Sequence, residues 1–118
     1  MTFYRLTDQA RRDIVAIDGW SEHQYGSAHA SGYEDLIRQA LDDLAADPMR
    51  AGSAGVPRLP GVRAYPIRHS APTRPRDRRI RAPWHKIVYR QQPDGIVQIL
   101  AVVGLSYPSG RAAWAAFP

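Results

Sequence analysis

The arginines and histidines of residues 68–90, "RHSAPTRPRDRRIRAPWHKIVYR", are the side chains of this sequence best suited to chemistry. Six arginines lie between Arg68 and Arg81, and guanidinium groups bind phosphate or carboxylate oxygens through charge-assisted hydrogen bonds. His69 and His85 belong to the same stretch, and histidine is the usual side chain for proton transfer near neutral pH. The stretch predicts a surface for a negatively charged partner, either nucleic acid or acidic protein. The alternative is a solvated loop.

The positive charge is concentrated in one segment of the chain. The 118 residues have a net charge of +5. Residues 1–55 have a balance of −4, residues 56–90 a balance of +9, and residues 91–118 a balance of 0. This asymmetry favours a basic binding surface over a merely solvated loop. We expect its binding residues to be Arg63, Arg68, His69, Arg78, Arg79, Arg81, His85 and Arg90.

Composition limits the other classes of function. The sequence has no cysteine, which excludes disulfides and thiolate metal sites and favours an intracellular protein. His69 and His85 have no clustered carboxylates beside them, so we expect no metal and no cofactor. No apolar run approaches the roughly 18 residues that span a bilayer. The N-terminus does not resemble a signal peptide, so we expect a cytoplasmic protein without a membrane partner.

The first half of the chain predicts one strand and two helices. "TFYRL", residues 2–6, alternates like a short strand, and Thr7 is a plausible N-cap for an amphipathic helix over residues 8 to about 24. A second apolar stripe predicts a helix that begins between Ser27 and Ser31, with a capping box of Ser31 and Glu34, and ends before Asp47-Pro48. The short connection predicts an antiparallel helical hairpin. The aromatic residues around the connection, Trp20, Tyr25 and Tyr33, favour packing over a grip on a partner.

The second half predicts a small sheet. Residues 50–61 are rich in glycine and proline and indicate a loop. Residues 62–69 predict a strand in which Pro66 requires an edge or a bulge, and residues 70–84 form an excursion rich in proline and arginine. Residues 85–92 and 95–104 predict two strands joined by a tight turn at Pro93-Asp94-Gly95. For the tail, residues 105–118, we expect a short helix.

The order β-α-α-β-β-β indicates an α+β fold, with a helical hairpin packed on a small, mostly antiparallel sheet. Residues 1–118 are long enough for one domain with a core of its own. The segments "LTDQARRDIVAIDGW", "SGYEDLIRQALDDLAADP", "GVRAYPIRHS", "RRIRAPWHKIVYR" and "IVQILAVVGL" follow one another in this order. Together they resemble the ParE/RelE superfamily of toxins from bacterial type II toxin–antitoxin systems, over roughly residues 4–106. The "RHS" and the pattern P-x-H-x-I-x-Y-R place the chain closer to ParE.

The resemblance implies a toxin that a cognate acidic antitoxin holds inactive. ParE-like members inhibit DNA gyrase, whereas RelE-like members cut messenger RNA on the ribosome. A ribosome-dependent nuclease of this type must stabilise a charged phosphate and move protons. Its candidate residues here are Arg68, Arg81, His85 and Tyr89.

Two features favour a ParE-like inhibitor over a RelE-like nuclease. RelE-like chemistry relies on several lysines, and Lys86 is the only lysine in this sequence. His85 opens a predicted strand, where packing and hydrogen bonding are its more common role. One departure from the superfamily concerns the end of the last strand. Many members have leucine-histidine there, and this chain has Leu105-Ser106, so no histidine is available at that position.

Overall fold

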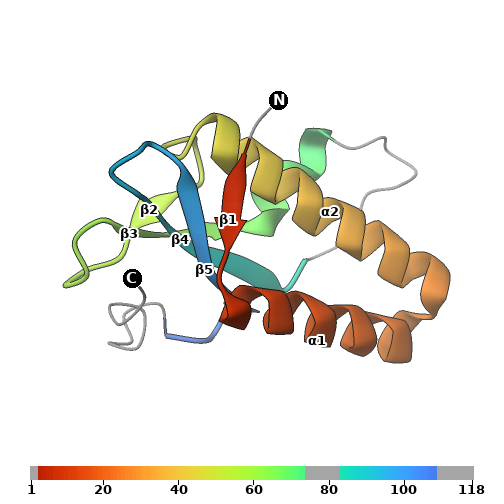
Figure 1. Cartoon of the computed structure of the whole chain (residues 1–118). Coiled ribbons are helices and arrows are strands. Elements are labelled where there is room, and N and C mark those ends of the chain that lie inside the picture. The colour runs from red at the N-terminus through yellow and green to blue at the C-terminus, as the bar shows by residue number, and fades with distance from the viewer. Residues whose placement is uncertain (1–2, 74–82, 109–118) are drawn as a thin grey trace.

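A five-stranded sheet forms the centre of the computed structural model, which describes residues 3–73 and 83–108 (Figure 1). Its strands are β1 (Tyr4–Leu6), β2 (Ala54–Gly55), β3 (Val62–Pro66), β4 (His85–Gln91) and β5 (Val97–Gly104), in the spatial order β1-β5-β4-β3-β2. β1 runs parallel to β5, and the other pairs are antiparallel. The predicted α+β fold with a mostly antiparallel sheet is confirmed.

Two helices, α1 (Asp8–Tyr25) and α2 (Ser27–Ala46), form the predicted hairpin and cover one face of the sheet (Figure 1). Thr7 is the N-cap of α1, as predicted. Its hydroxyl accepts from the backbone N–H of Ala10 at 3.0 Å and donates to the carbonyl of Leu100 at 2.9 Å. One side chain therefore both begins α1 and ties it to β5.

The predicted capping box at Ser31 and Glu34 is wrong, because α2 already begins at Ser27. Gly26 separates the helices with φ of +87°, a conformation that glycine adopts without steric cost, so the chain reverses within one residue. Glu34 lies inside α2 and pairs with Arg38 one turn later, with 2.8 Å between carboxylate and guanidinium.

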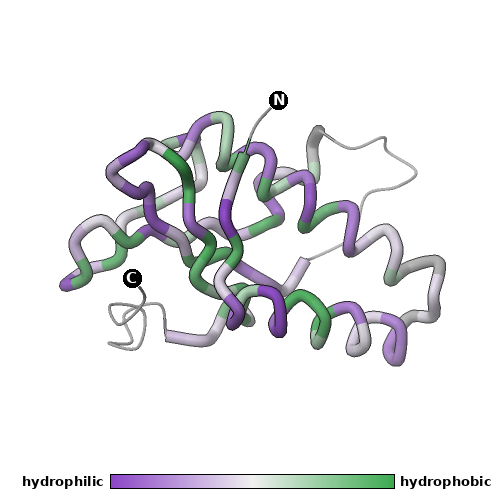
Figure 2. The backbone as a smooth tube through the Cα atoms, in the orientation of Figure 1, coloured by the Kyte–Doolittle hydropathy of each residue, from purple (hydrophilic) through white to green (hydrophobic). Residues whose placement is uncertain are grey.

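The sheet is packed on both faces. The helix side holds the larger cluster, which includes Tyr33, Leu36, Leu41, Tyr65, Ile87, Tyr89 and Ile99. The other side holds a smaller cluster of Val56, Val62, Val88, Leu100 and Ala101. A register irregularity between Val88 and Tyr89 turns both Leu100 and Ala101 toward that smaller cluster. β5 is thus buried on both faces, as its continuous aliphatic run predicts. Both helices alternate between hydrophobic and hydrophilic residues along their length, as expected for helices with one face against the sheet (Figure 2).

The segment after β3 differs from its prediction. Residues 67–69 do not continue the strand but begin a 3-10 helix, η1 (Ile67–Thr73), which packs against α2. Pro66 ends β3, and β2 pairs only with Arg63 and Ala64, so Pro66 lies at an edge as expected. The sequence predicts a loop at Ala54 and Gly55, because neither has a strand-like side chain. In the structure the two residues form β2, which pairs with β3 through the backbone alone.

The turn between β4 and β5 has the predicted form. Gly95 has φ of +87°, and the N–H of Gln92 donates to the carbonyl of Ile96 at 2.9 Å. Asp94 accepts from the N–H of Ile96 at 3.0 Å and pairs with Arg5 at 2.8 Å. Within the described ranges, no helix is long and apolar enough to cross a bilayer.

Candidate partner-binding site

Arg63 lies on β3 opposite Tyr89 of β4, and directly opposed residues share one face of a sheet. Tyr89 belongs to the helix-side cluster, so Arg63 lies on the helix-covered face, near the edge strand β2. Its guanidinium donates from Nε and Nη2 to the hydroxyl of Ser53, at 3.1 and 2.7 Å. Ser53 therefore fixes the orientation of this half-buried cation.

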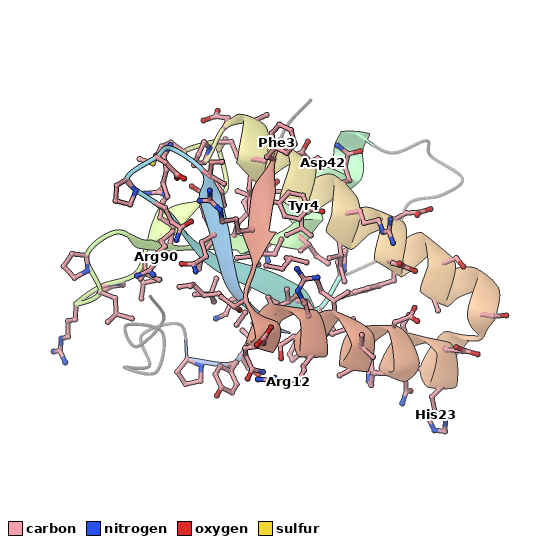
Figure 3. The ribbon with its side chains drawn as sticks, in the orientation of Figure 1. Phe3, Tyr4, Arg12, His23, Asp42 and Arg90 are labelled. Carbon is pink, nitrogen blue, oxygen red and sulfur yellow. The ribbon has the colours of Figure 1, made fainter. Side chains whose placement is uncertain are left out.

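Arg90 lies on the opposite face. It opposes Val62 of the smaller cluster, and its Nε donates to the side-chain oxygen of Gln98 at 2.8 Å. Successive residues of a strand point to opposite faces, and Arg90 directly follows Tyr89, the residue opposite Arg63. Arg90 and Arg63 therefore lie on opposite faces of the sheet. The expected single basic face of the sheet is therefore wrong for these two arginines. Figure 3 shows Arg90 at the end of the molecule far from His23.

η1 carries Arg68 and His69. Arg68 is exposed, and the half-buried ring of His69 lies 5.7 Å from the ring of Tyr65, measured between centroids. Burial lowers the pKa of His69, and the charges of Arg68 and Arg50 lower it further. His69 therefore favours its neutral form next to two cations, and an anion bound there would reverse part of this effect.

A partly buried polar cluster of Asp43, Arg50, Tyr65 and Ser70 anchors η1 to α2. Asp43 accepts from the hydroxyl of Ser70 at 2.7 Å and pairs with Arg50 at 2.8 Å. The hydroxyl of Ser70 also lies 2.7 Å from the Tyr65 hydroxyl, and the Arg50 guanidinium lies 5.6 Å from the centre of the Tyr65 ring. Sequence patterns do not predict this cluster, since Ser70 is 27 residues from Asp43 and Asp43 belongs to the polar side of a predicted helix.

His85 is buried at the start of β4, with 8% of its surface exposed. Its Nδ1 lies 2.5 Å from the hydroxyl of Tyr33, which accepts from the backbone N–H of Trp84 at 3.0 Å. Burial lowers the pKa of His85 to about 4, so the ring is neutral at pH 7. Since Trp84 donates to the Tyr33 oxygen, we infer that the Tyr33 hydroxyl donates to an unprotonated Nδ1.

The remaining predicted residues are placed as follows. Tyr89 is fully buried, and its hydroxyl donates to the carbonyl of Pro48. Trp20 and Tyr33 pack in edge contact with His85, as their predicted packing role requires. Lys86 donates to the carbonyls of Leu105 and Tyr107 at the end of β5. Arg78, Arg79 and Arg81, together with most of the tail, lie outside the described residues.

In the part of the chain that the structure describes, no three histidines or acidic residues come together as metal ligands. Arg63 and Arg90 are held by uncharged partners, Arg68 is exposed and His69 is half-buried, while His85 and Tyr89 are enclosed in the core. The fold and these residues define a small α+β protein that presents guanidinium groups on both sides of one sheet.

Comparison with protein families shows to which family this chain belongs. Residues 4–104 match the ParE toxin of type II toxin–antitoxin systems, parDE, so the chain belongs to the ParE toxin family. Among solved structures it is similar to one described as the chromosomal ParDE toxin–antitoxin system from P. aeruginosa. That match has a TM-score of 0.63 and 21% identity, and covers 90% of this chain and 98% of the other. Comparison with curated proteins gives no match.

Proposed function

We propose that this ParE-family toxin inhibits DNA gyrase by binding it, and that a cognate antitoxin neutralises the toxin. The observation that carries the proposal is the family match, which spans residues 4–104 and thus every described helix and strand. The relative from P. aeruginosa is described as a toxin–antitoxin system, which supports an antitoxin partner for this chain as well.

The charge distribution supports an acidic antitoxin segment as the partner. Residues 56–90 have a charge balance of +9. Among the described residues, the ion pairs join Arg5, Arg38 and Arg50 to carboxylates, and none of them involves Arg63, Arg68 or Arg90. A disordered acidic segment that folds on binding would gain charge-assisted hydrogen bonds from Arg63, Arg68 and Arg90.

The burial of the candidate bases supports binding over ribonuclease chemistry. A general base must reach the proton it removes, within hydrogen-bond distance or through one water. The hydroxyl of Tyr89 is enclosed and donates to a backbone carbonyl, and Nδ1 of His85 faces Tyr33. A nuclease would need both groups to be rearranged before they could act on RNA.

A gyrase supercoiling assay tests the proposal. Purified toxin at micromolar concentration should inhibit supercoiling of relaxed plasmid, and a stoichiometric amount of the antitoxin encoded beside the toxin should restore it. Heat-unfolded toxin is the control for non-specific effects of a basic chain on DNA. Undisturbed supercoiling, together with cleavage of messenger RNA in a translation reaction, would replace the proposal with the nuclease alternative.

A further inference from the structure

Two hollows lie next to each other at the end of the sheet where the β2–β3 loop meets β4. The first has a volume of about 480 Å³ and includes Met49, Val56, Leu59 and Arg63 in its lining. The second has a volume of about 370 Å³ and includes Arg90 and Gln92. Both are lined by Pro60, Gly61 and Gln91, so they are two parts of one depression that bends around this loop.

The linings of both hollows contain arginine but no carboxylate. Arg63 lines the first hollow and Arg90 lines the second. Within residues 3–73 and 83–108, neither arginine forms an ion pair. Each guanidinium has five N–H donors, of which Ser53 takes two from Arg63 and Gln98 takes one from Arg90. Both arginines are therefore oriented by neutral partners and keep donors for a ligand. Arg58 adds an exposed cation on the same loop.

The first hollow is largely apolar apart from Arg63. Met49 is 65% exposed at its rim, and Val56, Leu59, Pro60 and Val62 contribute further apolar surface. Neither lining contains an aromatic side chain on which a base could stack. Alternating apolar and guanidinium groups suit a peptide that carries both carboxylates and aliphatic side chains better than a phosphate backbone.

We propose that this depression, which we call the loop groove, binds an acidic peptide segment with aliphatic anchors. The segment passes around Pro60-Gly61, so that one carboxylate meets Arg63 on the helix-covered face and another meets Arg90 on the opposite face. This explains why two oriented arginines lie on opposite faces of the sheet and yet at one end of it. The inference deepens the proposed function, because an antitoxin segment is its natural occupant, but its test does not involve gyrase.

The loop groove is tested with a fluorescein-labelled synthetic peptide of fourteen residues in which glutamate and leucine alternate. Fluorescence anisotropy should show saturable binding to the full-length toxin. Arg63→Gln and Arg90→Gln should each weaken it about tenfold, as expected for loss of one charge-assisted contact. Met49→Ser should weaken it about threefold. Arg12→Gln removes the same charge from exposed α1 and should leave the affinity unchanged.

Amide NMR shifts of the wild-type toxin provide a second readout that needs no variant to fold. Added peptide should shift the N–H signals of Gly55, Gly61 and Gln91. No saturable binding, shifts confined to other regions, or equal weakening by Arg12→Gln would overturn the proposal. Tighter binding of a single-stranded oligonucleotide with the same variant profile would also overturn it, in favour of a nucleic-acid site. If the groove fails while gyrase is inhibited, the proposed function stands without this docking site.

Discussion

His85 shows how a single side chain is shaped by its surroundings. Its ring is buried among Trp20 and Tyr33, and Tyr33 occupies its Nδ1. Burial disfavours the charged imidazolium, which explains why the pKa falls from the ordinary 6.5 to about 4. In this conformation the ring contributes packing and one hydrogen bond, and a proton taken up at Nδ1 would remove the acceptor of the Tyr33 hydroxyl and place a charge in the core.

His85 should therefore make stability depend on pH. Because its pKa is lower in the folded state, the unfolded chain binds the proton more tightly, and stability falls as pH drops from about 6.5 toward 4. Asparagine offers an acceptor at the position of Nδ1 but does not titrate. Wild-type toxin should lose about 2 kcal/mol more than His85→Asn between pH 7.5 and pH 5, measured by urea unfolding. An equal loss in both proteins would show that His85 is not the titrating group.

Asp43 is the second residue whose surroundings make a specific prediction. It accepts from Gln39 and Ser70 and pairs with Arg50, so its carboxylate connects α2 with two later segments. Asp43→Asn keeps the shape but removes the charge, which should cost about 2 kcal/mol of unfolding free energy. Exposed Asp42→Asn removes the same charge one residue away and should cost less than about 0.5 kcal/mol. Similar losses in the two variants would contradict the anchoring role.

At the scale of elements, the loop between α2 and β2 positions η1 through direct contact. Gly52 has φ of +99°, and a Cβ added there would lie 2.5 Å from Cγ of His69. The loop therefore needs glycine for two reasons, the backbone conformation and the ring above it. The close approach of Gly52 to the His69 ring thus positions η1, which precedes the segment richest in arginine.

Gly52→Ala should destabilise the toxin by about 3 kcal/mol, of which about 1 kcal/mol comes from the positive φ and the rest from the collision. Gly61→Ala is the matched control, since Gly61 has φ of +82° but nothing within 4 Å of an added Cβ, and should cost about 1 kcal/mol. Combining Gly52→Ala with His69→Ala should recover most of the difference in thermal or urea unfolding. Without such recovery, the two residues do not collide.

The elements themselves follow well from sequence patterns. Thr7, the two apolar stripes and Pro93-Asp94-Gly95 specify helix start, hairpin and turn through local chemistry, and each appears as predicted. β2 and η1 were not predicted, because both depend on what the chain meets after it folds. β2 forms by pairing with β3, and η1 forms where Ser70 reaches Asp43.

The candidate site was less predictable than the fold for a related reason. Charge counts identify a basic segment but contain no information on which face each cation occupies. The register that pairs Arg63 with Tyr89, and Arg90 with Val62, places the two arginines on opposite faces. Their partners Ser53 and Gln98 are equally hidden in the sequence, since neither lies near its arginine in the chain.

Over the whole molecule, acidic helices lie against the sheet, while the excess positive charge belongs in the sequence to residues 56–90, which include β3, η1 and most of β4. This polarity favours encounter with anionic partners and should make antitoxin association sensitive to salt. Association measured by stopped flow should slow at least tenfold between 20 and about 300 mM NaCl, while dissociation changes less. Salt-independent association would mean that the arginines do not guide the encounter.

The proposal that the toxin acts by binding gyrase can be tested on the enzyme itself. The most direct measurement is gyrase-dependent DNA cleavage. Supercoiled plasmid, gyrase and ATP are incubated with toxin, and trapped complexes are then released with detergent and protease. If the toxin binds gyrase and traps the cleaved DNA, linear plasmid should appear only when gyrase and toxin are both present, and should be absent when antitoxin is added first. Intact plasmid at micromolar toxin, with ribosome-dependent cleavage of messenger RNA by the same preparation, would contradict the proposal.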